Sequence, residues 1–83
     1  MGMFGQVQRL WTGKVLRDYG VIGDRSIRGV RRTIAVLLTD RGGTRLVIRE
    51  TYTGLGFRVN FIELDRDEVV KLNDAIQQAL PHL

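Results

Sequence analysis

Runs of strand-forming hydrophobic residues, interrupted by polar and glycine-containing segments, occupy the middle of the chain. The run at 32–39, RTIAVLLT, is rich in β-branched residues and leucine. The runs at 44–52, TRLVIRETY, and 57–64, FRVNFIEL, alternate apolar and polar side chains. Between the first two, DRGG at 40–43 predicts a tight hairpin turn, because Gly-Gly tolerates positive φ angles. These patterns predict three consecutive antiparallel strands.

The alternation in 44–52 predicts which side chains share a face of the sheet. The more apolar face carries Leu46, Ile48 and Tyr52. The opposite face carries Arg45, Val47, Arg49 and Thr51, provided that no bulge intervenes. Tyr52 therefore needs a bulge or strand twist to join the face with the arginines.

A further strand is predicted upstream. The segment TGKVLRDYGVIGD at 12–24 indicates a strand that ends near Gly20 or Gly23. Residues 24–31, DRSIRGVR, are expected to form a basic loop. Residues 1–10 show weak patterning and predict a flexible N-terminal arm, which leaves 11–83 as one domain.

The hydrophobic period changes after residue 64. Asp65 followed three residues later by Glu68 predicts a helix capping box, and Pro81 is expected to stop the helix. Between them, an apolar stripe at helical spacing consists of Val69, Leu72, Ile76 and Leu80. The stripe must be buried on the chain's own sheet or on a second copy. The predicted fold is α+β, a four-stranded antiparallel sheet followed by one helix, in the order β-β-β-β-α.

The length of the chain favours association with a second subunit, and its composition argues against several classes of functional site. A chain of 83 residues buries only about 60% of its unfolded surface, so a partner subunit would stabilise it. It has no cysteine, and its only histidine is His82 near the end. Together with the absence of nucleophile and phosphate-loop motifs, this argues against an enzyme, a cofactor or a metal site. The acidic residues at the helix start are explained by capping and the helix dipole.

No apolar run approaches the roughly 20 residues of a membrane span, and the N-terminus lacks the layout of a signal peptide. We therefore expect a soluble, cytoplasmic protein that does not interact with membranes.

Charge is distributed unevenly along the chain, whose net charge is +4. The stretch 25–58 contains eight arginines and only two acids, whereas 63–74 contains five acids and two basic residues. Arginines on a sheet can neutralise phosphates, and aromatic rings beside them can stack on bases. The candidate nucleic-acid-binding residues are Arg25, Arg28, Arg31, Arg32, Arg41, Arg45, Arg49, Tyr52 and Arg58. The alternatives are a solvated surface for the arginines and a core-edge position for Tyr52.

Several segments in order resemble the transcriptional coactivator positive cofactor four family, in particular its small bacterial and phage relatives. They are YGVIG at 19–23, the basic stretch after it, VIRETY at 47–52, and LDRDEVVKLNDAI at 64–76. The resemblance spans roughly residues 14–80 and lies in the order and spacing of these segments.

The resemblance implies a curved antiparallel sheet of four strands followed by one helix, and a homodimer formed through helix and strand contacts. It also implies sequence-tolerant binding of single-stranded DNA along the β-ridges, in transcription, replication or repair, by a nucleoid-associated protein. By position, Arg49 and Tyr52 match a basic residue and an aromatic residue that contact the strand. Arg41 and Arg45 fall at the hairpin where the family has basic and aromatic contacts.

Two other functions share these sequence features. A single-stranded RNA would be bound by the same arginines and aromatic ring. A protein-interaction module could instead dock an acidic partner, such as a transcription or replication protein, on the basic sheet.

Overall fold

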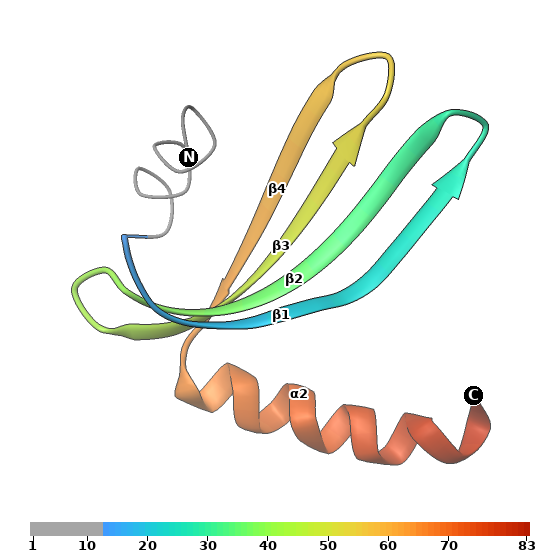
Figure 1. Cartoon of the computed structure of the whole chain (residues 1–83). Helices are drawn as coiled ribbons and strands as arrows, with labels where there is room; N and C mark the ends of the chain where they lie inside the picture. The colour runs from blue at the N-terminus through green and yellow to red at the C-terminus, as the bar shows by residue number, and fades with distance from the viewer. Residues whose placement is uncertain (1–12) are drawn as a thin grey trace.

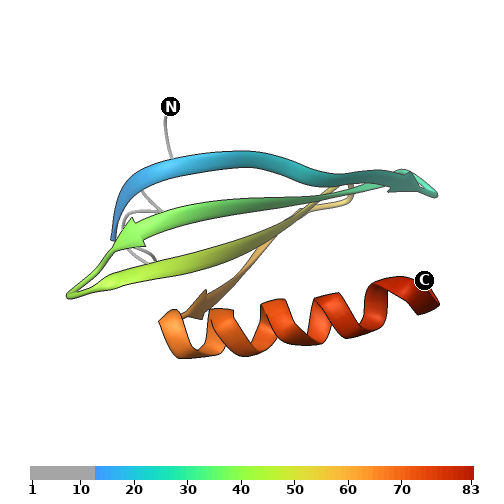
Figure 2. The same cartoon turned by 90° about the horizontal axis from the view of Figure 1, so that it is seen from below.

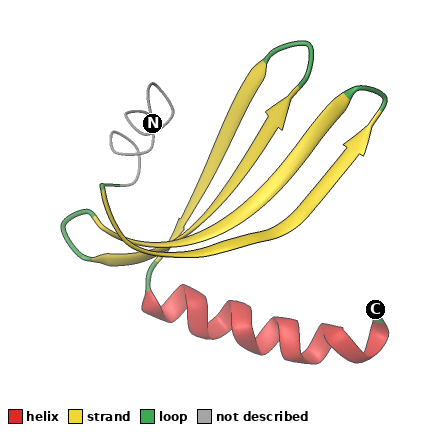
Figure 3. Ribbon diagram, viewed as in Figure 1, coloured by secondary structure: helices red, strands yellow, loops and turns green. Residues whose placement is uncertain are grey.

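The computed structural model describes residues 13–83; the arm predicted at 1–10 lies outside the described residues. One sheet of four antiparallel strands, in the order β1-β2-β3-β4, is followed by one helix (Figures 1 and 3). The elements are β1 (Lys14–Ile27), β2 (Val30–Asp40), β3 (Thr44–Thr53), β4 (Phe57–Leu64), α2 (Arg66–Ala79) and a final 3-10 turn (Leu80–His82). The predicted α+β architecture is confirmed.

The predicted end of the first strand is wrong. β1 continues through Gly20 and Gly23 to Ile27, and the segment 24–31 is not a loop. The reversal takes only two residues, Arg28 and Gly29, whose φ angles are 53° and 80°. Two successive positive φ values give the turn the twist that flanking antiparallel strands need. The basic segment is therefore the tip of a hairpin.

Bulges in β1 explain why its glycines do not end it. The pairing of β1 with β2 shifts register at three points, which leave Leu16, Tyr19 and Ile22 without a directly opposite residue. Each shift reverses the simple alternation of side chains along the strand. Fourteen residues of β1 consequently accompany eleven residues of β2.

The other predicted turns and caps are confirmed. In the β2–β3 turn, Gly42 and Gly43 have φ angles of 66° and 146°. At the start of α2, the Glu68 backbone N–H donates to Asp65 Oδ1 at 2.9 Å. In return, the Asp65 backbone N–H donates to Glu68 Oε1 at 3.0 Å, which completes the capping box.

The core within one chain is small. Among residues 13–83, the buried side chains are Ala35, Leu37, Thr39 and Val47, all on β2 and β3. The register places these four on one face of the sheet, because Leu37 pairs directly with Val47. So few buried residues provide little hydrophobic stabilisation for a chain of this length.

The helix is poorly covered by its own sheet. It lies on the outside of the curved strands and contacts mainly β3 and β4 (Figures 1 and 2). Val69 is half-buried, but Leu72, Ile76 and Leu80 are 36%, 45% and 52% exposed. The predicted apolar stripe is therefore present, and the sheet of the same chain does not bury it.

Candidate nucleic-acid interface

Tyr52 and Arg49 lie on opposite faces of the sheet. β3 pairs with both of its neighbours without a register shift, so its side chains alternate regularly. The predicted binding residues are therefore divided between two surfaces. We call these surfaces the Tyr52 face and the Arg49 face.

On the Arg49 face, the arginines are engaged with the protein. Arg31 makes a two-pronged ion pair with Asp24, with N–O distances of 2.9 and 2.6 Å. Arg49 is half-buried, and burial lowers the pKa of its guanidinium against the opposing effect of the Asp18 charge. Arg45 donates from Nη1 to the Thr44 carbonyl at 3.1 Å. This face also carries the small core, which limits its use as a binding platform.

On the Tyr52 face, four predicted binding residues form one line across the sheet. Arg25 of β1 is opposite Arg32 of β2, Arg32 is opposite Tyr52 of β3, and Tyr52 is opposite Arg58 of β4. Directly opposite residues in an antiparallel sheet have neighbouring side chains on the same face. We call these four residues the basic row.

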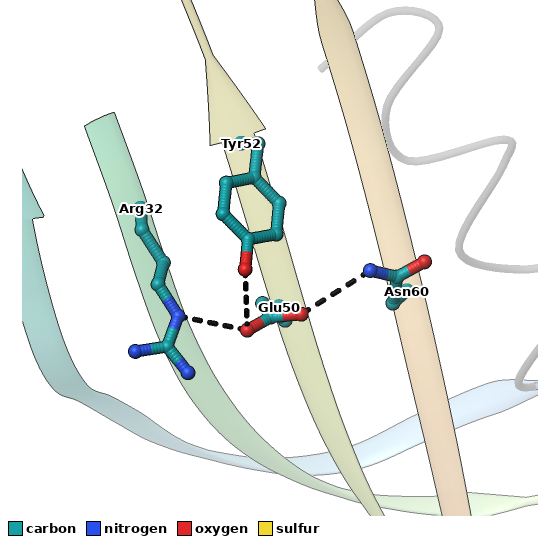
Figure 4. A network of polar contacts seen from close by, with 4 residues as sticks. All are labelled: Arg32, Glu50, Tyr52 and Asn60. Carbon is teal, nitrogen blue, oxygen red and sulfur yellow. Dashed lines mark hydrogen bonds and ion pairs between the residues drawn. The ribbon is translucent and has the colours of Figure 1, made fainter. Parts of the chain in front are cut away.

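Beside the basic row, Glu50 links three of the strands (Figure 4). Its carboxylate accepts hydrogen bonds from Arg32 Nε at 2.7 Å, the Tyr52 hydroxyl at 3.0 Å and Asn60 Nδ2 at 3.2 Å. The hydrogen bond from Arg32, followed by those from Asn60 and Tyr52, lowers the pKa of Glu50. The carboxylate is therefore charged at neutral pH and holds both Arg32 and the Tyr52 ring in place.

Two open hollows flank the Tyr52 ring. One, of about 270 Å³, extends from Tyr52 over the β3–β4 turn to Phe57 and Arg58, and Val30 also lines it. The other, of about 110 Å³, is lined by Arg25, Ile27, Val30, Arg32 and Tyr52. Both combine apolar walls with a guanidinium, a combination that suits the flat face and polar edge of a nucleobase.

The β1–β2 and β3–β4 turns meet at this end of the sheet. A Cβ atom built on Gly54 would lie 2.6 Å from the Gly29 carbonyl oxygen, so the two turns are in close contact. Arg28 projects from the tip of the first turn and is exposed. None of Arg25, Arg28 and Arg58 forms an ion pair with an acid in the described part of the chain.

The predicted residue Arg41 lies elsewhere. It occupies the β2–β3 turn at the opposite end of the sheet, where its Nη1 is 3.1 Å from Glu63 Oε1. Arg45 is the second residue of β3, directly after this turn, and lies on the Arg49 face. The structure therefore brings together Arg25, Arg32, Tyr52 and Arg58, and separates Arg41, Arg45 and Arg49 from them.

Sequence reasoning missed Glu50 and Asn60 as parts of this site. Glu50 is the only acid within 41–58, between predicted binding residues, which is a signal that could have been noticed. Its partners, however, come from β2 and β4 and depend on strand register. Alternation alone does not define register.

Comparison of the chain with protein-family models, curated proteins and solved structures found no match. Among residues 13–83, no three His, Cys, Asp or Glu side chains are grouped so that they could hold a metal ion. In the same range, no helix has the length and apolar character needed to cross a membrane.

Proposed function

We propose that this protein is a homodimeric, sequence-tolerant single-stranded-DNA-binding domain. The observation that supports this function best is the basic row, in which a tyrosine flanked by two hollows lies between arginines on one open face. The resemblance to the positive cofactor four family supports the same function. It favours a cytoplasmic, nucleoid-associated protein that acts in transcription, replication or repair in a bacterium or a phage-infected cell.

The row offers separate contacts for the two parts of a nucleotide. Arg25, Arg28 and Arg58 would neutralise backbone phosphates and release counterions. Tyr52 would stack on a base, an interaction that does not depend on base identity. A duplex keeps its bases stacked inside, so only an unpaired strand can use both kinds of contact. The remaining predicted residues lie away from the basic row and could contact DNA only on other surfaces of the sheet. They are Arg31, Arg41, Arg45 and Arg49.

The exposed helix stripe supports a homodimer. Leu72, Ile76 and Leu80 are partly exposed. Apolar side chains at helical spacing that the chain's own sheet leaves exposed favour burial against a symmetric copy. A dimer would also supply the hydrophobic stabilisation that the small core of one chain lacks.

Fluorescence anisotropy with a labelled 20-base single strand and its duplex, at three salt concentrations, tests this function. We expect tighter binding of the single strand, with a log–log salt slope of about −2 to −4 at roughly −0.7 per phosphate. Arg58→Gln should make the slope shallower by about 0.7, whereas Arg66→Gln on the helix should leave it unchanged. Equal, weak binding of both DNA forms that disappears near physiological salt would refute the proposal.

A further inference from the structure

Charge is not uniform along the basic row. Arg32 is paired with Glu50 at 2.7 Å, whereas Arg25 and Arg58 at the two ends form no ion pair within residues 13–83. The middle of the row, formed by Arg32 and Tyr52, is therefore nearly neutral, and its ends are cationic. Glu50 causes this difference.

The hydrogen bonds of Glu50 keep its charge in place. Three donors from three strands converge on the one carboxylate, which is three-quarters buried. The same donors lower its pKa, so it does not become neutral near physiological pH. A phosphate placed over the middle of the row would be repelled by the negative charge of Glu50, and Arg32 is already paired with Glu50.

Single-stranded and duplex DNA would respond differently to such a surface. A duplex presents its phosphates outward and shields the faces of its bases. It therefore binds favourably only where the protein surface that it contacts carries cationic groups. A single strand can turn a base onto Tyr52 and keep its phosphates near the cationic ends. A neutral middle between cationic ends therefore penalises the duplex more than the single strand.

We propose that Glu50 is a specificity-determining residue, which makes the basic row favour single-stranded over duplex DNA by occupying Arg32 and by repelling phosphates from the middle of the row. This inference rests on the proposed function. Glu50 would affect only the preference between the two DNA forms, because it would not itself contact the DNA backbone.

The test compares Glu50→Gln with Asp24→Asn in the full-length chain. Both remove one negative charge that is paired with an arginine near the same end of the sheet, but Asp24 and Arg31 lie on the Arg49 face. Single-strand and duplex affinities are measured by anisotropy with the same labelled oligonucleotides. The readout is the ratio of the two dissociation constants.

With Glu50→Gln, duplex affinity should rise about two- to fivefold more than single-strand affinity, the range expected for one partly exposed ion pair at the protein surface. The duplex salt slope should become steeper by about 0.9, equivalent to one more neutralised phosphate. Asp24→Asn should leave the ratio at its original value. Equal changes in the ratio for the two variants, or weaker binding of both DNA forms by Glu50→Gln without a change in the ratio, would overturn the inference.

Arg32→Gln provides a second test if Glu50→Gln does not fold, as judged by circular dichroism. Because Glu50 already neutralises Arg32, this variant should keep the single-strand salt slope, whereas Arg58→Gln reduces it by about 0.7. An equal reduction by both variants would overturn the role of Glu50. An unmodified protein that does not bind single strands would instead refute the proposed function, so the two failures are distinguishable.

Discussion

Tyr52 of β3 and Arg58 of β4 lie directly opposite each other on one face of the sheet, at the end where two hairpin turns meet. The larger of the two hollows beside Tyr52 extends between these residues. A base stacked on the ring would consequently have a guanidinium within reach of its phosphate or its edge. This pair defines the part of the surface where substitutions should affect binding most.

Tyr52→Leu should weaken single-strand binding by about 1–3 kcal/mol, or roughly 5- to 150-fold, because it removes the ring on which a base stacks. Tyr52→Phe is the matched control, since it keeps the ring and loses only the hydroxyl that donates to Glu50 at 3.0 Å. Anisotropy at one salt concentration measures both. Equal losses for Leu and Phe would show that the hydroxyl, and not stacking, matters.

Ile76→Lys should convert a dimer into a monomer at micromolar concentration, because it places a charge in the apolar stripe of α2. Sedimentation velocity measures the change in mass. Gln78→Lys is the control, since Gln78 lies on the other side of the helix and its amide is 3.0 Å from Asp74. A dimer that persists in Ile76→Lys would exclude the stripe as the interface.

Acid should remove the stabilisation that Glu50 provides. Its pKa in the folded state is below the ordinary value of 4.5, because Arg32, Asn60 and Tyr52 donate to the ionised form. The stabilisation is therefore complete above about pH 4.5 and is lost as pH falls through the folded-state pKa. The difference in Tm between the unmodified protein and Glu50→Gln should shrink below pH 4.5.

Asp24 does not confound this comparison. Arg31 lowers the pKa of Asp24 in the same direction, but Asp24 is present in both proteins and its contribution cancels in the difference. A Tm difference that stays constant from pH 7 to strongly acidic conditions would contradict the prediction.

Gly54→Ala should destabilise the protein by about 1–3 kcal/mol in urea unfolding. The φ angle of Gly54 is 151°, and a Cβ there would lie 2.6 Å from the Gly29 carbonyl oxygen. Gly56→Ala in the same turn is the control, because a Cβ on Gly56 meets no atom within 4 Å. If the two variants are equally stable, the close contact between the turns is unimportant.

Several features of the fold could be predicted from the sequence because each depends only on residues that are close together in the chain. The alternation in 44–52 assigned Tyr52 and Arg49 to opposite faces, and β3 has no bulge to alter it. The turn at 40–43 and the capping box at Asp65 depend on neighbouring residues alone. Such features are determined by a few adjacent side chains and backbone angles.

The end of β1 could not be predicted in the same way. Its turn uses Arg28 with a φ angle of 53°, a conformation that arginine rarely adopts. The two-residue turn places Arg25 directly opposite Arg32, and the bulges at Leu16, Tyr19 and Ile22, which resemble no short sequence motif, decide which way the earlier residues of β1 face. The basic row thus depends on register between strands, which the packing of the whole sheet determines.

The strand order has a consequence for how the protein folds. Every strand pairs only with strands next to it in the sequence, and the most distant paired residues are Lys14 and Asp40. Because each strand pairs with its neighbour in the sequence, the sheet can form by successive hairpins, and an isolated hairpin forms in about 1–10 μs. The proposed association of two chains through the helix would be a slower step whose rate depends on protein concentration. The proposed DNA-binding surface lies on the sheet of one chain and would therefore form before the proposed association of two chains.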